Sequence, residues 1–133
     1  MTDRIASFDE FWPFYVREHS KPLTRWMHFA GTSAAMACGT ALVKSRKLRW
    51  IPIGLVAGYG PAWISHFFVE KNRPASFKYP LWSLIADLKM WDLMRRGLMD
   101  AEVERVLGHA AGSNGASHGA AAREGQPSRA AAN

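Results

Sequence analysis

The stretch WIPIGLVAGYGPAWISHFFV, from Trp50 to Val69, runs for twenty residues without a formal charge. An earlier stretch, Trp26 to Val43, is uncharged for eighteen residues, and the basic segment KSRKLR separates the two. Both stretches reach the roughly 18–20 residues that an α-helix needs to cross a bilayer core. The sequence therefore predicts an antiparallel helical hairpin with two membrane spans. A helical hairpin buried in a soluble protein is the alternative, because both stretches are rich in Gly and Ala and poor in Leu.

An amphipathic helix is predicted on the N-terminal side of this hairpin. Ser7 and Glu10 have the spacing of a capping box, and large apolar residues then recur at helical spacing as far as Val16. The helix should end near His19, because Pro22 disfavours helical backbone in the residue before it. Its aromatic face can pack on a core or lie in a bilayer interface.

A second amphipathic helix is predicted on the C-terminal side, where apolar residues recur at helical spacing over 81–94. A third membrane span there is disfavoured, since Asp87, Lys89 and Asp92 would each cost a few kcal/mol at mid-bilayer. A short helix is expected around Asp100 to Leu107. The fold class is thus all-α, with a single helical domain over residues 1–108.

Residues 109–133 carry almost no large apolar side chains. They cannot bury enough apolar surface to offset their ordering entropy, and we expect a disordered C-terminal tail. His109 and His118 belong to this tail and receive no functional role.

The charge balance is basic, with 17 Lys and Arg against 11 Asp and Glu, a net charge of +6. This balance suits an anionic partner. The basic residues bracket the apolar stretches instead of forming one stripe with interleaved aromatics, which favours membrane lipids and argues against nucleic acid. The single cysteine, Cys38, excludes a disulfide within the chain and is typical of a reducing compartment.

Small residues recur every four positions in both halves of the hairpin. The first stretch has Gly31, Ala35 and Gly39, and the second has Gly54, Gly58 and Ala62. Such stripes let two helices approach closely, within one chain or between copies, so an oligomer is possible through these faces.

The second stripe, extended by its own period, continues to His66 and Glu70, and His28 lies on the face of the first stripe. His28 stands fifteen residues before Val43, and His66 sixteen residues after Trp50. At about 1.5 Å per residue both histidines lie about 22–24 Å from the turn. We therefore expect them to face each other near the open end of the hairpin. His19, nine residues before His28 and across the break at Pro22, can fold back over the same end.

These residues form a candidate metal site made of His19, His28, His66 and Glu70. Two ligands at positions i and i+4 of one helix can reach one metal, as with His66 and Glu70. Three imidazoles and a carboxylate suit iron, manganese or zinc, and histidine with carboxylate is the ligand combination of non-haem iron oxygenases. The simpler interpretation is that each histidine is hydrogen-bonded to a neighbour, and that Glu70 pairs with Arg73 or Lys71. The sequence contains no phosphate-binding loop, nucleophile elbow or paired-cysteine zinc motif.

Two segments, FYVREHSKPLTRWMHFAGT and ISHFFVEKNRPASFKYPLWSLIADLKMW, resemble the small membrane proteins related to the fungal 2-hydroxy fatty acid dioxygenase, long catalogued as a domain of unknown function. The resemblance covers about Phe8 to Arg96. Its motifs are the nine-residue spacing from His19 to His28 and a histidine that leads into Glu-Lys-x-Arg-Pro-Ala.

The resemblance implies an iron(II)-dependent enzyme that uses dioxygen to shorten a 2-hydroxy fatty acid by one carbon. By position, His19, His28 and His66 match the metal histidines of the family, and Glu70 matches its motif as a candidate. Five residues after the first histidine the family commonly has Asn, whereas this sequence has Thr24. If that Asn orients a ligand or substrate, Thr24 alters the contact.

A fatty acid substrate also needs a partner for its carboxylate. Arg25 is one candidate. The two others are Arg73 and Lys71, and a guanidinium suits a bidentate grip on a carboxylate. Both residues are equally suited to anchoring a helix end at a membrane interface.

Two further functions remain open. His28 and His66 on facing helices could ligate a haem from both sides, which would make the protein an electron carrier. Alternatively, the histidines could only cross-link helices by hydrogen bonds in a non-catalytic membrane organiser.

We expect an integral protein of a bacterial inner membrane, with the site facing the cytoplasm. Four basic residues lie in the hairpin turn and six lie near the two outer ends of the apolar stretches, namely Arg17, Lys21, Arg25, Lys71, Arg73 and Lys78. The positive-inside bias therefore favours a cytoplasmic location for both ends, and with them the site.

Overall fold

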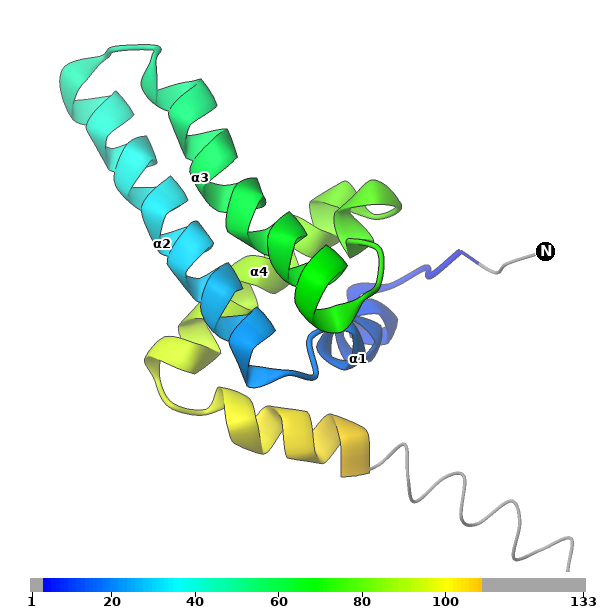
Figure 1. Ribbon diagram of the computed structural model, residues 1–133. Coiled ribbons are helices and arrows are strands. Elements are labelled where there is room, and N and C mark those ends of the chain that lie inside the picture. The colour runs from blue at the N-terminus through cyan, green and yellow to red at the C-terminus, as the bar shows by residue number, and fades with distance from the viewer. Residues whose placement is uncertain (1–3, 109–133) are drawn as a thin grey trace, which may run out of the picture.

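A computed structural model describes residues 4–108 of the 133-residue chain (Figure 1). Within this range the predicted all-α fold class is confirmed. The elements are α1 (Phe8–Glu18), α2 (Pro22–Ser45), α3 (Trp50–Ile64), the π-helix η1 (Ser65–Glu70), the 3₁₀-helix η2 (Ala75–Phe77) and α4 (Pro80–Arg95), followed by a helix over residues 99–108. The predicted disordered tail, residues 109–133, lies outside the described residues.

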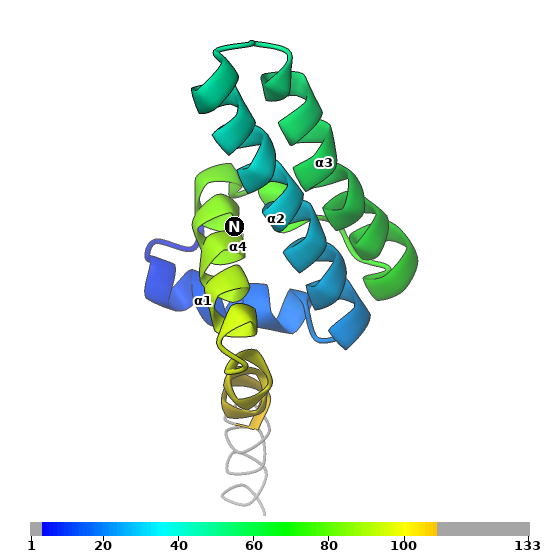
Figure 2. The ribbon, with the colours of Figure 1, turned by 90° about the vertical axis from the view of Figure 1, so that its left-hand side faces the viewer.

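The hairpin is formed by α2 and α3, which run antiparallel and side by side in Figures 1 and 2. Glycines allow this close approach: a Cβ atom added to Gly31 would lie 2.8 Å from the carbonyl oxygen of Gly58. One added to Gly54 would lie 3.1 Å from the Cβ atom of Cys38. The two small-residue stripes thus pack on each other inside one chain. Association between copies stays a prediction.

The lengths of the hairpin helices differ from the predicted spans. α2 is 24 residues long and begins at Pro22, whereas α3 has 15 residues and ends at Ile64, where the π-helix begins. Within residues 4–108, none of the helices combines the length and the apolar character that a membrane crossing requires. The two membrane spans are therefore not confirmed and stay a prediction.

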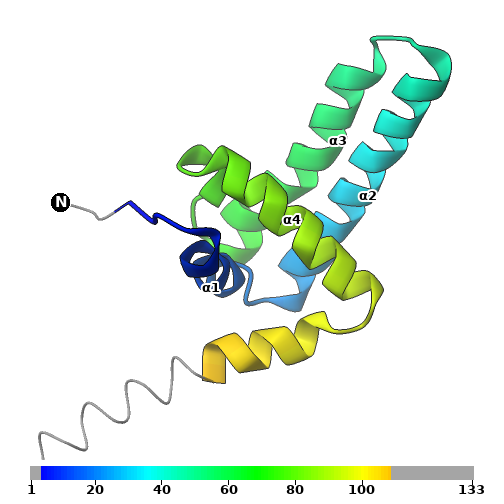
Figure 3. The same ribbon diagram turned by 180° about the vertical axis from the view of Figure 1, so that it is seen from behind.

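The remaining helices form a hydrophobic core beside the open end of the hairpin. In Figure 3, α4 crosses the hairpin with α1 on its other side. The core combines residues from α1, α4, the η2 region and the last helix, namely Phe11, Trp12, Tyr15, Val16, Ala75, Tyr79, Ala86, Met90, Met99, Val103 and Val106. The aromatic face of α1 is therefore buried in the protein, which decides between the two predicted uses of that face.

The boundaries of α1 follow from its sequence. The Ser7 side chain accepts a hydrogen bond from the backbone N–H of Glu10 at 3.2 Å, which is the predicted N-cap. At the other end the N–H of His19 bonds the carbonyl of Val16 at 3.1 Å, and Pro22 then occupies the first turn of α2. The break between α1 and α2 lies where the proline predicts it. It leaves His19 at the junction of the two helices.

Candidate metal centre

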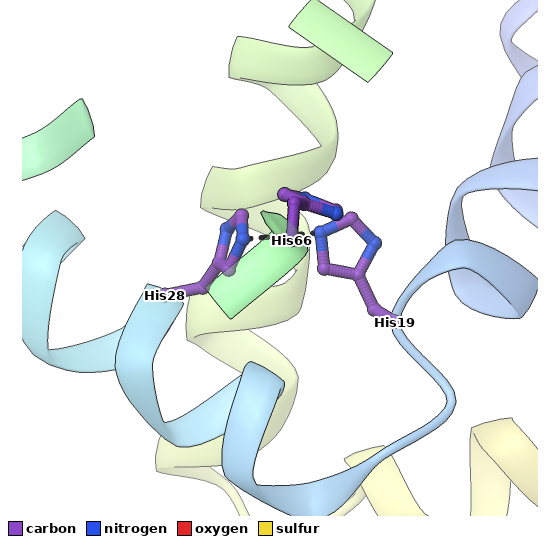
Figure 4. A group of neighbouring side chains, drawn as sticks. All are labelled: His19, His28 and His66. Atoms are coloured by element: carbon purple, nitrogen blue, oxygen red, sulfur yellow. Dashed lines mark hydrogen bonds between the residues drawn. The ribbon is translucent and has the colours of Figure 1, made fainter. Parts of the chain in front are cut away.

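The three histidines converge at the open end of the hairpin, as the helical spacing predicts. His19, His28 and His66 are 0 %, 5 % and 2 % exposed. Each contributes a ring nitrogen, and these nitrogens lie within 4.8 Å of one another. The ring centroids are 4.4 Å apart for His19 and His28 and 5.1 Å apart for His28 and His66. Figure 4 shows the rings turned toward a common centre, from three separate segments.

Two contacts hold His19 in this position. The ring of Tyr15, one turn earlier in α1, stacks on the imidazole with 3.9 Å between centroids. Arg25 is 4 % exposed, and its guanidinium donates hydrogen bonds to the carbonyls of His19 at 3.0 Å and Ser20 at 2.6 Å. The same guanidinium pairs with Asp100 at 3.0 Å. Arg25 therefore secures the connection between α1 and α2.

The π-helix η1 positions His66. It begins at Ser65, four residues after Pro61, and ends at Glu70. Its C-cap is Lys71, whose φ of 60° lies in the left-handed region. π-helical turns are rare and occur frequently at functional sites. The chain then reverses, and Asn72 returns its side chain to the His66 ring. The turn thus supplies both a histidine and its hydrogen-bond partner.

An oxygen atom lies against the Nδ1 atom of every histidine in the cluster. For His19 it is the backbone carbonyl of Tyr15 at 2.7 Å, and for His28 a carboxylate oxygen of Asp87 at 2.9 Å. For His66 it is the side-chain oxygen of Asn72 at 2.7 Å. The Asn72 amide is oriented by its nitrogen, which donates to the backbone and side-chain oxygens of Glu18 at 3.2 and 2.7 Å.

These acceptors determine the tautomers. A carbonyl or carboxylate can only accept, so each Nδ1 carries the proton, and in a neutral imidazole Nε2 is then an unprotonated nitrogen with a free lone pair. The Nε2 atoms of His19 and His28 lie 3.3 Å apart. Two lone pairs at that distance repel, and a cation between them removes the repulsion. Metal-binding histidines commonly donate their other N–H to an oxygen in this way.

A proton shared between the rings is the alternative, and it is disfavoured by the electrostatics of His19. Burial lowers the pKa of His19 well below its usual value, and the neighbouring His28 and His66 lower that pKa further. The backbone hydrogen bond to Tyr15 opposes this shift. His19 is therefore neutral near pH 7, which is the form that binds a metal.

The space beside the rings also fits a single ion. A cavity of about 20 Å³ borders the cluster, and Tyr15, Ser83 and Asp87 are among its lining residues. A volume of this size holds one water-sized particle. It does not hold a porphyrin, so the arrangement does not favour the haem alternative. Within the described residues, the three buried histidines can therefore hold a metal ion, and imidazole ligands suit iron, zinc, copper or nickel.

Glu70 lies outside the cluster, which corrects the predicted ligand set. Its carboxylate accepts hydrogen bonds from the backbone N–H of Lys21 at 2.9 Å and the hydroxyl of Ser20 at 3.4 Å. The prediction assumed α-helical stacking of residues i and i+4. The π-helix that contains His66 and Glu70 is wider, so the carboxylate is turned away toward the start of α2.

The side chains of Lys71 and Arg73 are not part of the cavity lining beside the histidines. Both residues are exposed. The predicted grip on a substrate carboxylate is therefore not built by this arrangement. Among the described residues that line that cavity there is no lysine or arginine.

Three supporting residues were not predicted from the sequence: Tyr15, Asn72 and Asp87. Asp87 accepts hydrogen bonds from the Tyr15 hydroxyl and from His28, so it links α1, α2 and α4 at the site. In the sequence, Tyr15 is one of the apolar residues that recur along α1, so nothing sets it apart from the core. Asp87 is one of several charged residues on the amphipathic helix α4. No local pattern joins Asp87 to a histidine 59 positions away.

Thr24, at the position where the resembling family commonly has Asn, is fully buried in α2. Its hydroxyl has no hydrogen-bond partner among the described residues. It does not line the cavity beside the histidines. Thr24, which replaces the Asn that is common in the family, therefore does not form part of the cavity wall.

Comparison with known protein families gives a match. The family model described as 2-hydroxy-palmitic acid dioxygenase Mpo1-like matches residues 5–99, a range that contains all three histidines together with Asn72 and Asp87. No curated protein and no solved structure matches the chain.

Proposed function

This chain belongs to the 2-hydroxy-palmitic acid dioxygenase Mpo1-like family, and from that premise we propose that it is an iron(II)-dependent dioxygenase that shortens 2-hydroxy fatty acids by one carbon. The observation that carries the proposal is the cluster of three buried histidines, whose Nδ1 atoms are all engaged by oxygen acceptors. Their Nε2 atoms are left to bind a metal. The family description supplies the fatty acid and dioxygen as reactants.

Each residue has a distinct part in this proposal. His19, His28 and His66 hold the iron, which when bound supplies the activation of dioxygen at the carbon that bears the hydroxyl group. Asp87 and Asn72 keep His28 and His66 in the tautomer that binds metal. Three protein ligands would leave an iron ion here with positions for substrate and dioxygen. Glu70, Lys71 and Arg73 have no direct part.

We also propose that the protein works at the bacterial inner membrane, with its site on the cytoplasmic side. Large apolar side chains on the hairpin and η1 are exposed, including Val43 at 77 %, Val56 at 73 % and Phe68 at 76 %. Exposed apolar surface of this kind is typical of membrane or protein contact. Retention of the protein in the membrane fraction after an alkaline wash would support the proposal, and release into the supernatant would contradict it.

The function is tested by metal analysis of full-length protein purified without oxygen, followed by oxygen uptake with 2-hydroxypalmitate. We expect iron to bind, and His19→Ala, His28→Ala or His66→Ala to abolish both binding and uptake. His118→Ala serves as the matched control, since His118 lies outside the described residues and has no assigned role. If the wild-type protein takes up no more oxygen than a triple histidine variant, the dioxygenase proposal is wrong.

A second pair of variants tests how the site is supported. Asp87→Asn removes the carboxylate that orients His28, and loss of such a partner typically lowers metal affinity about 10–100-fold. Asp92→Asn, on the same helix, removes a carboxylate whose ion pairs within residues 4–108 are with Arg95 and Arg96. We expect that variant to bind iron like the wild type. Equal affinities in the two variants would contradict a role for Asp87.

A further inference from the structure

A second, larger cavity lies beside the histidine cluster and is not used by the metal. It is a groove of about 460 Å³ between α2, α3 and α4. It runs from Leu42 and Trp50 near the hairpin turn to His28 and Asp87 at the open end. A volume of this size is within the usual range of small-molecule sites.

The groove adjoins the small cavity beside the three histidines. His28, Tyr59, Ala62 and Asp87 line both. Along the rest of its length the wall is almost wholly apolar, because the facing positions of the two hairpin helices are small or aliphatic. One elongated apolar ligand can therefore lie in the groove with one end at the histidines.

The end of this path at the histidines is polar. Ser83 is 4 % exposed and lines the small cavity, and its hydroxyl has no hydrogen-bond partner among the described residues. A buried hydroxyl without a partner costs free energy, and a ligand oxygen in the cavity would remove that cost. The polar end of a ligand is thus expected beside Ser83.

We infer that the groove binds the acyl chain of a long-chain carboxylic acid, with its carboxyl end at Ser83 and the histidines and its methyl end toward Trp50. The inference deepens the proposed function and rests on it for the substrate class. In the metal-free protein, one carboxylate oxygen enters the small cavity and accepts a hydrogen bond from the Ser83 hydroxyl. This role replaces the one predicted for Arg73 and Lys71.

The part of the groove near the hairpin turn should limit the length of the acyl chain that can bind. Gly39 lines the groove eleven residues beyond His28, a rise of about 16 Å along α2. A Cβ atom at Gly39 would meet nothing within 4 Å. We therefore expect a larger side chain there to extend into the groove, because its Cβ atom would not strike the backbone of α3. It should shorten the longest chain that fits.

Binding of non-hydroxylated fatty acids to full-length, metal-free protein tests the inference without any turnover. Octanoate, laurate and palmitate are compared by calorimetry. We expect Gly39→Leu to weaken palmitate binding by about fourfold for each methylene excluded from the groove, and to leave octanoate binding unchanged. Gly60→Leu is the matched control, because Gly60 also has open space around a Cβ atom but does not line the groove.

The direction of the chain is tested separately. Ser83→Ala should weaken the binding of all three acids by the same factor, since it affects the carboxyl end that they share. If Ser83→Ala has no effect while Arg49→Gln near the turn weakens binding, the chain lies in the opposite direction and the inference is overturned. Leu42→Phe, at the far end, should reproduce the length dependence if Gly39→Leu fails to fold.

The outcomes for the groove and for the function are distinct. Palmitate affinities that are equal in the wild type, Gly39→Leu and Gly60→Leu would overturn the groove inference even if iron-dependent oxygen uptake is found. Conversely, length-dependent binding without oxygen uptake would support the groove and contradict the dioxygenase proposal.

Discussion

The two ends of this molecule differ in the size of the residues that they bury. Where α1, α4 and residues 99–108 meet, large side chains such as Phe11 and Met90 are at most 1 % exposed. In the α2–α3 hairpin the buried positions include Gly31 and Ala62, and large side chains such as Val56 are exposed. The first end is held by side-chain packing and the second by close backbone approach. The histidine cluster lies where the two meet, so its metal ligands come from both.

The largest effect is expected from a truncation in the packed end. Phe11→Ala removes a fully buried ring whose centroid lies 5.4 Å from that of Tyr79. Such changes lower the free energy of unfolding by about 3–5 kcal/mol. Val56→Ala on the hairpin, where the side chain is 73 % exposed, should change it by less than about 0.5 kcal/mol. Denaturant unfolding measures both, and similar losses would contradict the contrast between the two ends.

An intermediate effect is expected where the hairpin backbones touch. Gly31→Ala places a Cβ atom 2.8 Å from the carbonyl oxygen of Gly58, a contact that requires the helices to move apart. Overpacking of this kind costs about 1–3 kcal/mol. Gly39→Ala, on the same helix, has open space and should stabilise it by about 0.5–1 kcal/mol, because Ala loses less conformational entropy than Gly. Thermal unfolding followed by circular dichroism distinguishes these opposite signs.

The smallest effect is a pH dependence at the packed end. Hydrogen bonds from Arg105 and, to a lesser extent, from the Trp12 indole lower the pKa of Glu102 to about 2, although partial burial opposes them. The unfolded chain takes up this proton near its usual pKa of about 4.3. The contribution of Glu102 to the free energy of unfolding is therefore fully present above about pH 4.3, and it is lost as the pH falls toward about 2.

The variant Glu102→Gln should remove this dependence. The pair with Arg105 is partly solvent-exposed, so the difference should stay below about 1 kcal/mol. Glu104→Gln, an exposed position on the same helix, is the control. The free energy of unfolding is measured for each protein between neutral and acidic pH. If it changes in parallel for Glu102→Gln and wild type, Glu102 is not the source of the pH dependence.

Much of this architecture was predictable because it follows from helical periodicity. The hairpin, the end of α1 before Pro22 and the last helix near 100–107 match the structure. The facing of His28 and His66 was predictable too, since two antiparallel helices joined by a short turn keep residues at equal distance from that turn at one level. The two membrane spans were not confirmed, and the predicted tail lies outside the described residues.

The parts that were not predictable depend on contacts between distant segments. The change from α-helix to π-helix at Ser65 turned Glu70 away from the cluster. The loop that brings Asn72 to His66 contains no pattern that specifies its path. Arg25, which had been considered as a carboxylate partner, is instead buried against the carbonyls of the α1–α2 connection.

The sequence by itself determined that the chain is helical and that three histidines meet at one end of a hairpin, and it made a metal ion a candidate occupant of that cluster. These features depend on local spacing, because the period of a helix determines which residues share a face. Only the tertiary structure decided which nitrogen of each histidine is free, since that depends on Tyr15, Asn72 and Asp87 from other segments. It also decided that a groove leads to the site, because the wall is built from three helices whose crossing no local period specifies.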